Sequence, residues 1–130
     1  MKILVGYDGS NAAMDALKLA VLHGKAFGAQ LAVVTSMIGG KEVKDEEIRQ
    51  SERQLEFAED YCHKEGAACE THLLIRGLTP GEDLVRFAEE KQVGEIVIGI
   101  KRRSKVGKLL FGSNAQYVIL NAPCPVVTVR

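Results

Sequence analysis

Two residues into the chain, the sequence reads Ile3-Leu4-Val5-Gly6-Tyr7-Asp8-Gly9-Ser10. The apolar run predicts a short buried strand, and the glycine-containing turn after it predicts where that strand ends. Ser10 is a preferred N-cap residue, and apolar residues at helical spacing follow it as far as Gly28, which is expected to end the helix. The stretch therefore predicts a strand, a turn and a helix in succession, which is the opening of an α/β fold.

The rest of the chain continues this alternation of short apolar runs and longer helical patterns. Further strands are predicted at residues 31–35, 69–75, 95–100 and 126–129, and further helices at residues 45–65, from Thr79-Pro80 onward, and at 113–120. Because parallel strands joined by helices need right-handed crossovers, this order predicts an open, mainly parallel five-stranded sheet with helices on both faces. No linker interrupts the pattern, so residues 1–130 are expected to form one domain.

The composition restricts the class of protein. Lys and Arg total 17 and Asp and Glu total 17, so the net charge of zero provides no field that would hold nucleic acid or an anionic membrane. No apolar run reaches the roughly 18 residues of a membrane span, and no signal-peptide pattern is present, so we expect a cytoplasmic protein. The three cysteines and three histidines show no metal-ligand spacing, which predicts neither a disulfide framework nor a metal site.

The most informative loop follows the predicted fourth strand and runs from Gly99 to Asn114. Five of the eight residues 101–108 are basic, and Gly112-Ser113 precede a predicted helix. A helix N-terminus offers unpaired backbone N–H groups and a partial positive charge, so the loop suits a polyphosphate. A solvated basic loop with an ordinary helix cap explains the same residues, and the pattern leaves both interpretations open.

Asp8 stands at the end of the predicted first strand. Its carboxylate can accept hydrogen bonds from ribose hydroxyls or help to hold a metal ion bound to phosphates, and an Asx turn before the helix accounts for it equally well. A P-loop ending at Gly107-Lys108 is excluded, because Arg102 replaces its first glycine and Leu109 replaces its Ser or Thr. Asp8 and the basic loop together favour a nucleotide over free phosphate.

These residues resemble the universal stress protein family over the whole chain. The first strand with Asp8-Gly9-Ser10 is similar to the opening of that family. The spacing of Gly99, two residues, Arg102, nine residues and Gly112-Ser113 is similar to its ATP-binding signature, and Cys124-Pro125-Val126-Val127-Thr128-Val129 resembles its last strand. The resemblance implies a Rossmann-like fold of the adenine nucleotide alpha hydrolase type, with five strands and four helices, that binds ATP or AMP in some members.

The resemblance also implies which residues bind the nucleotide. The residues expected near adenine and ribose are Gly6, Tyr7, Asp8, Ser36 (through its backbone) and Gly99. The residues expected at the phosphates are Arg102, Arg103, Gly112, Ser113 and Asn114. Any Mg²⁺ would be bound through the phosphates, and the resemblance implies no catalytic or metal-ligating residue.

Arg102 departs from the family signature, which has a glycine at that position. If the position requires a left-handed backbone, a non-glycine residue costs roughly 1–2 kcal/mol, whereas a hydrogen bond from its guanidinium to phosphate contributes about 1.5–3 kcal/mol. Because these magnitudes overlap, Arg102 is expected either to clamp the phosphates or to fill the site.

The leading hypothesis is an adenine-nucleotide-binding regulatory module of the stress response. It would form a homodimer through the strand Val126–Val129, as the resemblance implies, and act on a protein partner that the sequence does not identify. One alternative is a ligand-free interaction module in which Arg102 blocks the pocket. Another is a slow ATPase, although no histidine stands in either motif loop to act as a general base. Nucleic-acid binding is not expected, because no aromatic residue interleaves with the basic run at 101–108.

Overall fold

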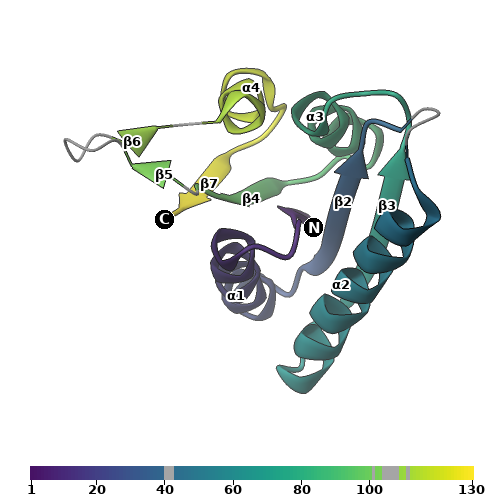
Figure 1. The fold of residues 1–130 in the computed structure, drawn as a ribbon. Helices are drawn as coiled ribbons and strands as arrows, with labels where there is room; N and C mark the ends of the chain where they lie inside the picture. The colour runs from purple at the N-terminus through teal and green to yellow at the C-terminus, as the bar shows by residue number, and fades with distance from the viewer. Residues whose placement is uncertain (40–42, 101, 104–108, 111) are drawn as a thin grey trace.

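The computed structural model describes residues 1–39, 43–100, 102–103, 109–110 and 112–130, with the backbone alone at 102–103 and 109–110. Strands and helices alternate along most of the chain (Figure 1). The first six elements are β1 (Lys2–Gly6), α1 (Asn11–Phe27), β2 (Gln30–Met37), α2 (Asp45–Lys64), β3 (Cys69–Ile75) and α3 (Pro80–Glu90). The others are β4 (Glu95–Gly99), β5 (Arg102–Arg103), β6 (Leu109–Leu110), α4 (Ser113–Asn121) and β7 (Val126–Val129).

The main sheet has five strands in the order β3-β2-β1-β4-β7. All four strand pairs are parallel, as in the pairing of Val5 with both Val33 and Val97. The chain moves outward from β1 through β2 to β3, returns to β4 on the other side of β1, and ends at β7. The order therefore reverses between β1 and β4, which is where open α/β sheets bind ligands. The predicted five-stranded parallel sheet is confirmed.

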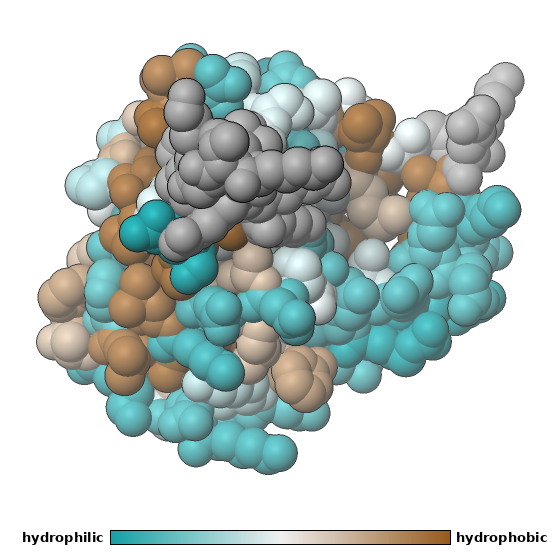
Figure 2. All heavy atoms as spheres, turned by 60° about the vertical axis from the view of Figure 1, so that its left-hand side comes forward, coloured by the Kyte–Doolittle hydropathy of each residue, from teal (hydrophilic) through white to brown (hydrophobic). Residues whose placement is uncertain are grey.

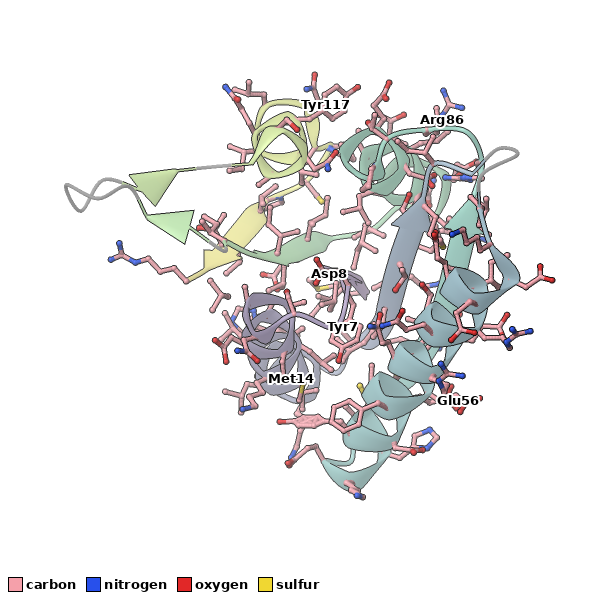
Figure 3. All side chains as sticks on the ribbon, in the orientation of Figure 1. Tyr7, Asp8, Met14, Glu56, Arg86 and Tyr117 are labelled. Atoms are coloured by element: carbon pink, nitrogen blue, oxygen red, sulfur yellow. The ribbon has the colours of Figure 1, made fainter. Side chains whose placement is uncertain are left out.

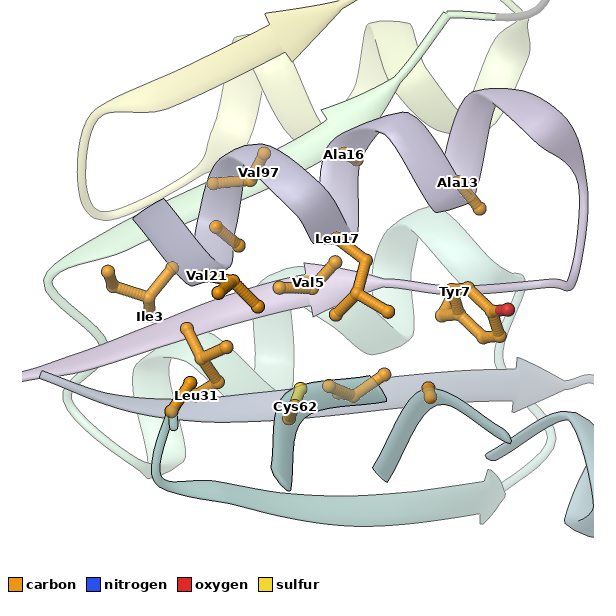
Figure 4. Close-up of a cluster of buried hydrophobic side chains, with 14 of the residues drawn as sticks. Ile3, Val5, Tyr7, Ala13, Ala16, Leu17, Val21, Leu31, Cys62 and Val97 are labelled. Carbon is orange, nitrogen blue, oxygen red and sulfur yellow. The ribbon is translucent and has the colours of Figure 1, made fainter. Parts of the chain in front are cut away.

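Two helices cover each face of this sheet (Figure 1). Ile3 and Val5 of β1 pack with residues of α1 and α2 on one face (Figure 4), while Leu4 packs with residues of α3 and α4 on the other. Strands that are buried on both faces must be apolar at successive positions. This explains why the first strand is a continuous apolar run with no alternation.

Local sequence signals set the helix ends. The Ser10 hydroxyl accepts a hydrogen bond from the Ala13 N–H at the start of α1, and Gly28 ends that helix with a left-handed φ of 65°. Thr79 and Glu82 form a reciprocal capping box at the start of α3, with Pro80 in its first turn. The predicted starts of both helices, and the predicted end of α1, are confirmed.

One feature was not predicted. Residues 102–103 and 109–110 pair as a short antiparallel ribbon, β5 with β6, outside the main sheet. Strands of two residues are too short to leave a periodic pattern in the sequence, so the whole segment was expected to be a loop. Among the described helices, none combines the length and the apolar composition needed to cross a bilayer.

Candidate functional site

A cavity of about 390 Å³ lies at the carboxyl ends of β1 and β4, where the strand order reverses. The ends of β1, β2 and β4 line it, together with the first turns of α1, α3 and α4. Its volume falls within the range of pockets that bury small organic ligands. The fold therefore places a ligand-sized cavity at the position that parallel sheets use for binding.

Most of the predicted binding residues meet in this cavity. Its lining includes Gly6, Tyr7, Asp8, Ser36, Gly99, Gly112 and Asn114. Ser113 begins α4 beside them but is not part of the lining. Arg102 and Arg103 form β5, and their side chains lie outside the described residues, so the expectation that Arg102 clamps or fills the site stays a prediction.

Asp8 forms the turn that leads into α1. Its Oδ1 accepts a hydrogen bond of 3.0 Å from the backbone N–H of Ser10, which is the Asx turn that the residue pattern allowed. Figure 3 shows Asp8 near the centre of the molecule, between α1 and β4. Asp8 is also the one acidic side chain among the described lining residues. The turn thus holds a carboxylate at the cavity, where it can accept hydrogen bonds from hydroxyl groups.

Tyr7 connects the site to the hydrophobic core. Its side chain is buried in the cluster between the sheet, α1 and α2 (Figure 4), and burial, followed by the charge of Asp8, raises the pKa of its phenol. Its backbone N–H donates to the Val34 carbonyl at 2.8 Å, and its carbonyl accepts from the Thr35 hydroxyl at 2.6 Å. Beyond the last residue of β1, the chain therefore stays attached to β2, and this attachment positions Asp8.

The N-termini of α3 and α4 meet at the opposite wall of the cavity. The side-chain Oδ1 of Asn114 accepts a hydrogen bond of 2.9 Å from the backbone N–H of Gly81. A Cβ atom on Gly81 would lie 2.8 Å from the Asn114 carbonyl oxygen, so this close approach requires glycine. Because Oδ1 is used in this way, the amide presents its NH₂ group as a donor.

Gly112 is the N-cap residue of α4, and neither its backbone conformation nor the described atoms around it require a glycine. Its φ of −63° and ψ of 160° are open to any residue, and a Cβ built on it would meet nothing within 4 Å among the described atoms. Since the N-cap residue is a glycine, it has no side chain to cap this helix end. Since the first backbone N–H groups of a helix have no partner within it, α4 offers hydrogen-bond donors and a partial positive charge at the cavity.

The sequence reasoning missed the apolar part of the lining. Val34, Leu84, Ile98, Ala115 and Val118 line the cavity and belong to the core between the sheet, α3 and α4. They come from four elements, β2, α3, β4 and α4, and the sequence alone gives each of them the pattern of an ordinary core residue. No local signal marks them, because the packing of the elements alone brings them to one cavity. They provide a surface against which a flat apolar group can lie.

A buried ion pair behind the cavity was also missed. The carboxylate of Asp83 is fully buried, and it accepts hydrogen bonds of 2.7 Å from the Ser36 hydroxyl and from Nε of Arg76. Arg76 reaches across to Glu90 as well, again at 2.7 Å. A buried carboxylate must be paired, and this pairing fixes the Ser36 side chain at the edge of the cavity.

Replacing Arg76 with Met should lower the free energy of unfolding by about 2 kcal/mol, because it leaves the Asp83 carboxylate buried with one neutral donor. The loss is expected below the full cost of breaking a buried pair, since the Arg76 side chain is 32% exposed. Urea unfolding measures it. Glu90→Gln is the matched control, because it removes only the exposed partner of Arg76 and should cost less than about 0.5 kcal/mol. Equal losses in the two variants would contradict this account of Asp83.

The described residues offer no preformed metal site. Within this part of the chain, no group of three His, Cys, Asp or Glu side chains is close enough to hold a metal ion.

A five-stranded parallel sheet with a partly polar, partly apolar cavity at its reversal point places the chain among the open α/β proteins, the class in which small ligands bind at this position. The universal stress protein family model matches residues 1–130, and the chain belongs to this family. A universal stress protein of Thermus aquaticus, located in the 3′ region of a QAH/OAS sulfhydrylase gene, is 33% identical over 134 residues that cover 98% of this chain and 97% of the relative.

Two solved structures from Archaeoglobus fulgidus are also similar. One universal stress protein is 43% identical with a TM-score of 0.93, and a second, solved in complex with dAMP, is 39% identical with a TM-score of 0.88. Each comparison covers 100% of this chain and 98% of the other. Members of this family with the same fold thus include a nucleotide-binding protein.

Proposed function

We propose that the cavity binds an adenine nucleotide and that this cytoplasmic protein acts as a nucleotide-responsive regulatory module. The observation that carries the proposal is the position of the N-terminus of α4 at the cavity. This helix begins after Gly112, and the packing of the described residues does not require a glycine there. Its N–H groups suit phosphate. The 39% identical relative that was solved with dAMP supports a mononucleotide as the occupant.

The lining residues suggest how the nucleotide would lie. The base would rest on the apolar surface that includes Val34 and Leu84, near Ser36, and the ribose hydroxyls would donate to Asp8. The phosphates would approach Gly112 and the NH₂ group of Asn114, with Arg102 and Arg103 contributing positive charge. Mg²⁺, when present, would be held through the phosphates, because Asp8 is the only carboxylate in the described lining.

Titration calorimetry with ATP, AMP and adenosine tests the proposal. We expect ATP or AMP to bind more tightly than millimolar, and adenosine to bind more weakly because it has no phosphate to occupy the start of α4. Mass spectrometry of small molecules released from freshly purified protein would identify a ligand that is already bound. If neither ATP nor AMP binds below millimolar concentration, the proposal is wrong.

Asn114→Asp should weaken ATP and AMP binding by at least about tenfold. The substituted carboxylate keeps the acceptor for the Gly81 N–H but places a negative charge beside the phosphates. Stability should stay unchanged or rise slightly, because an acidic side chain in the first turn of a helix contributes about 0.3–1 kcal/mol. Calorimetry and thermal unfolding measure the two effects. Adenosine affinity, which does not depend on phosphate contacts, is the control and should not change.

The edge of the sheet suggests how copies of the chain assemble. In the described structure β7 ends the strand order and pairs with β4 alone, so one of its edges lacks a strand partner. Tyr117, Ile119 and Leu120 of α4 are 39–72% exposed, and Figure 2, which brings this side forward, shows hydrophobic side chains at the surface. We therefore expect a homodimer through Val126–Val129, which analytical ultracentrifugation would detect and a monomer at all concentrations would contradict.

A further inference from the structure

Ser36 lies where the apolar wall of the cavity meets a buried carboxylate. It follows Val34 by two residues in β2, and alternate residues of a strand face the same side of the sheet. Both residues line the cavity, and the Ser36 hydroxyl contacts α3 through Asp83. Ser36 therefore places a polar group beside the apolar surface on which the proposed base would rest.

The direction of the Ser36 hydrogen bond is set by its partner. Oγ of Ser36 lies 2.7 Å from Oδ2 of Asp83, whose side chain is fully buried. An ionised carboxylate has lone pairs and no hydrogen to donate, so the hydroxyl must be the donor. The single hydroxyl hydrogen is used in this bond, and the lone pairs that remain on Oγ can only accept. Toward the cavity, the Ser36 hydroxyl is thus an acceptor and not a donor.

Arg76 keeps Asp83 in the form that this bond requires. Its Nε donates to Oδ1 of Asp83 at 2.7 Å, and its Nη2 forms an ion pair with the same oxygen. A guanidinium group is always charged and has donors only, so Oδ1 is an acceptor as well and the carboxyl group is bound as an anion. The Arg76–Asp83 ion pair therefore determines the polarity that Ser36 presents in the cavity.

An acceptor in the wall favours a base that carries a donor. Adenine has an amino group at position 6, which donates, whereas hypoxanthine and guanine have a carbonyl oxygen there, which accepts. A carbonyl oxygen facing Oγ of Ser36 would bring two acceptors together and leave both unpaired beside the apolar side chains of Val34 and Leu84. The wall is therefore suited to a 6-aminopurine and unsuited to a 6-oxopurine.

We propose that the Ser36 side chain accepts a hydrogen bond from the 6-amino group of the bound purine and that Asp83 and Arg76 are positioning residues, which make Oγ an acceptor. Neither Asp83 nor Arg76 lines the cavity, so both act through Ser36. This inference rests on the proposed function, because it concerns the base of the same nucleotide. It goes beyond the backbone contact expected of Ser36, since a side-chain acceptor makes the site selective against 6-oxopurines.

Calorimetry with three nucleotides tests this selectivity. AMP, inosine 5′-monophosphate (IMP) and purine riboside 5′-monophosphate share the ribose and the phosphate, and they carry an amino group, a carbonyl oxygen and a hydrogen at position 6. The purine riboside compound keeps the unprotonated N1 of adenine, so it lacks only the donor. We expect AMP to bind at least about tenfold more tightly than IMP, and at least about threefold more tightly than the purine riboside compound.

The three affinities distinguish failure of this inference from failure of the proposed function. If AMP binds no more tightly than IMP or than purine riboside 5′-monophosphate, the nucleotide site stands but Ser36 does not recognise the amino group. If none of the three binds, the proposed nucleotide site is itself wrong, and this inference falls with it.

Asp83→Asn separates a role in hydrogen bonding from a merely structural one. Arg76 should hold the amide oxygen at the position of Oδ1, because a guanidinium only donates, and the NH₂ group would then donate to Oγ of Ser36. The hydroxyl hydrogen of Ser36 could then turn toward the cavity and pair with a carbonyl. The ratio of AMP to IMP affinity should therefore fall at least about tenfold. An unchanged ratio in the folded variant, with both nucleotides weakened alike, would overturn the proposal.

Ser36→Ala decides the question if circular dichroism shows that Asp83→Asn does not fold. It removes Oγ, so the preference for AMP over purine riboside 5′-monophosphate should disappear while both nucleotides still bind. Glu90→Gln is the matched control, because it alters only the exposed partner of Arg76 and should keep the ratio of AMP to IMP affinity within about twofold. A preference that persists in Ser36→Ala, or that is lost in Glu90→Gln, would show that the selectivity does not come from Ser36 and Asp83.

Discussion

Gly112→Leu should abolish binding of ATP and AMP while leaving the protein folded. The side chain would occupy space at the start of α4 that no described residue fills, and it would keep a phosphate from the backbone N–H groups there. Charge-assisted hydrogen bonds contribute about 1.5–3 kcal/mol each, so the loss of two would weaken binding roughly 100-fold or more. Calorimetry against both nucleotides measures this loss.

The fold of the Gly112→Leu variant should change little, because φ and ψ at residue 112 suit any side chain. We expect a cost below about 1 kcal/mol from the poorer N-cap residue. Gly112→Ser is the matched control, since serine is a good N-cap residue and its small side chain leaves most of the space open. It should retain nucleotide affinity within about tenfold. Wild-type affinity in the leucine variant would show that phosphate does not approach α4.

Gly99→Ala, unlike Gly112→Leu, should mainly lower the stability of the fold. A Cβ atom on Gly99 would lie 2.2 Å from the carbonyl oxygen of Ala12 and 2.5 Å from its carbonyl carbon. These are backbone atoms in the first turn of α1, so no side-chain rotation relieves the clash. Moving the helix off the sheet should lower the free energy of unfolding by about 3 kcal/mol and the melting temperature by roughly 10 °C.

Nucleotide binding should be lost together with stability in this variant, because Ala12 lies between Ser10 and Ala13, which both line the cavity. Ala12→Gly is a useful second change. It removes the Cβ of residue 12, which would lie 2.9 Å from the added atom, but leaves the closer carbonyl in place. The Gly99→Ala/Ala12→Gly double variant should therefore stay destabilised. A stable Gly99→Ala protein with normal affinity would contradict the described packing of α1 on β4.

Gly99 and Gly112 belong to one sequence signature, but the structure explains the glycine at each position differently. Residue 99 must be glycine because the backbone of α1 lies too close to it for a Cβ atom. At Gly112, by contrast, no described atom would clash with a Cβ atom. A sequence pattern records that both positions hold glycine. It does not record which neighbour excludes a side chain, because that neighbour comes from a distant part of the chain.

The elements of the fold were largely predictable, because the signals that define them are local. Ser10 and Gly28 bound α1 as expected, and β3 and β7 have the predicted limits, Cys69–Ile75 and Val126–Val129. The ribbon formed by β5 and β6 was not predictable, since each strand has two residues. The position of the site could also be anticipated, because Asp8 after β1 and the loop after β4 were both expected to contact one nucleotide.

The sequence by itself determined the alternation of strands and helices, the parallel sheet that follows from it, and the polar residues at the strand ends, because periodicity, capping and crossover handedness are properties of short segments. Only the tertiary structure decided what surrounds those residues. It buried Asp83 with Arg76 and brought five apolar residues into the cavity lining. Each of these contacts joins different elements, and its geometry depends on how helices pack on the sheet. Ile3-Leu4-Val5 thus indicates a strand, but the ligand cavity at its end exists only once α3 and α4 close over it.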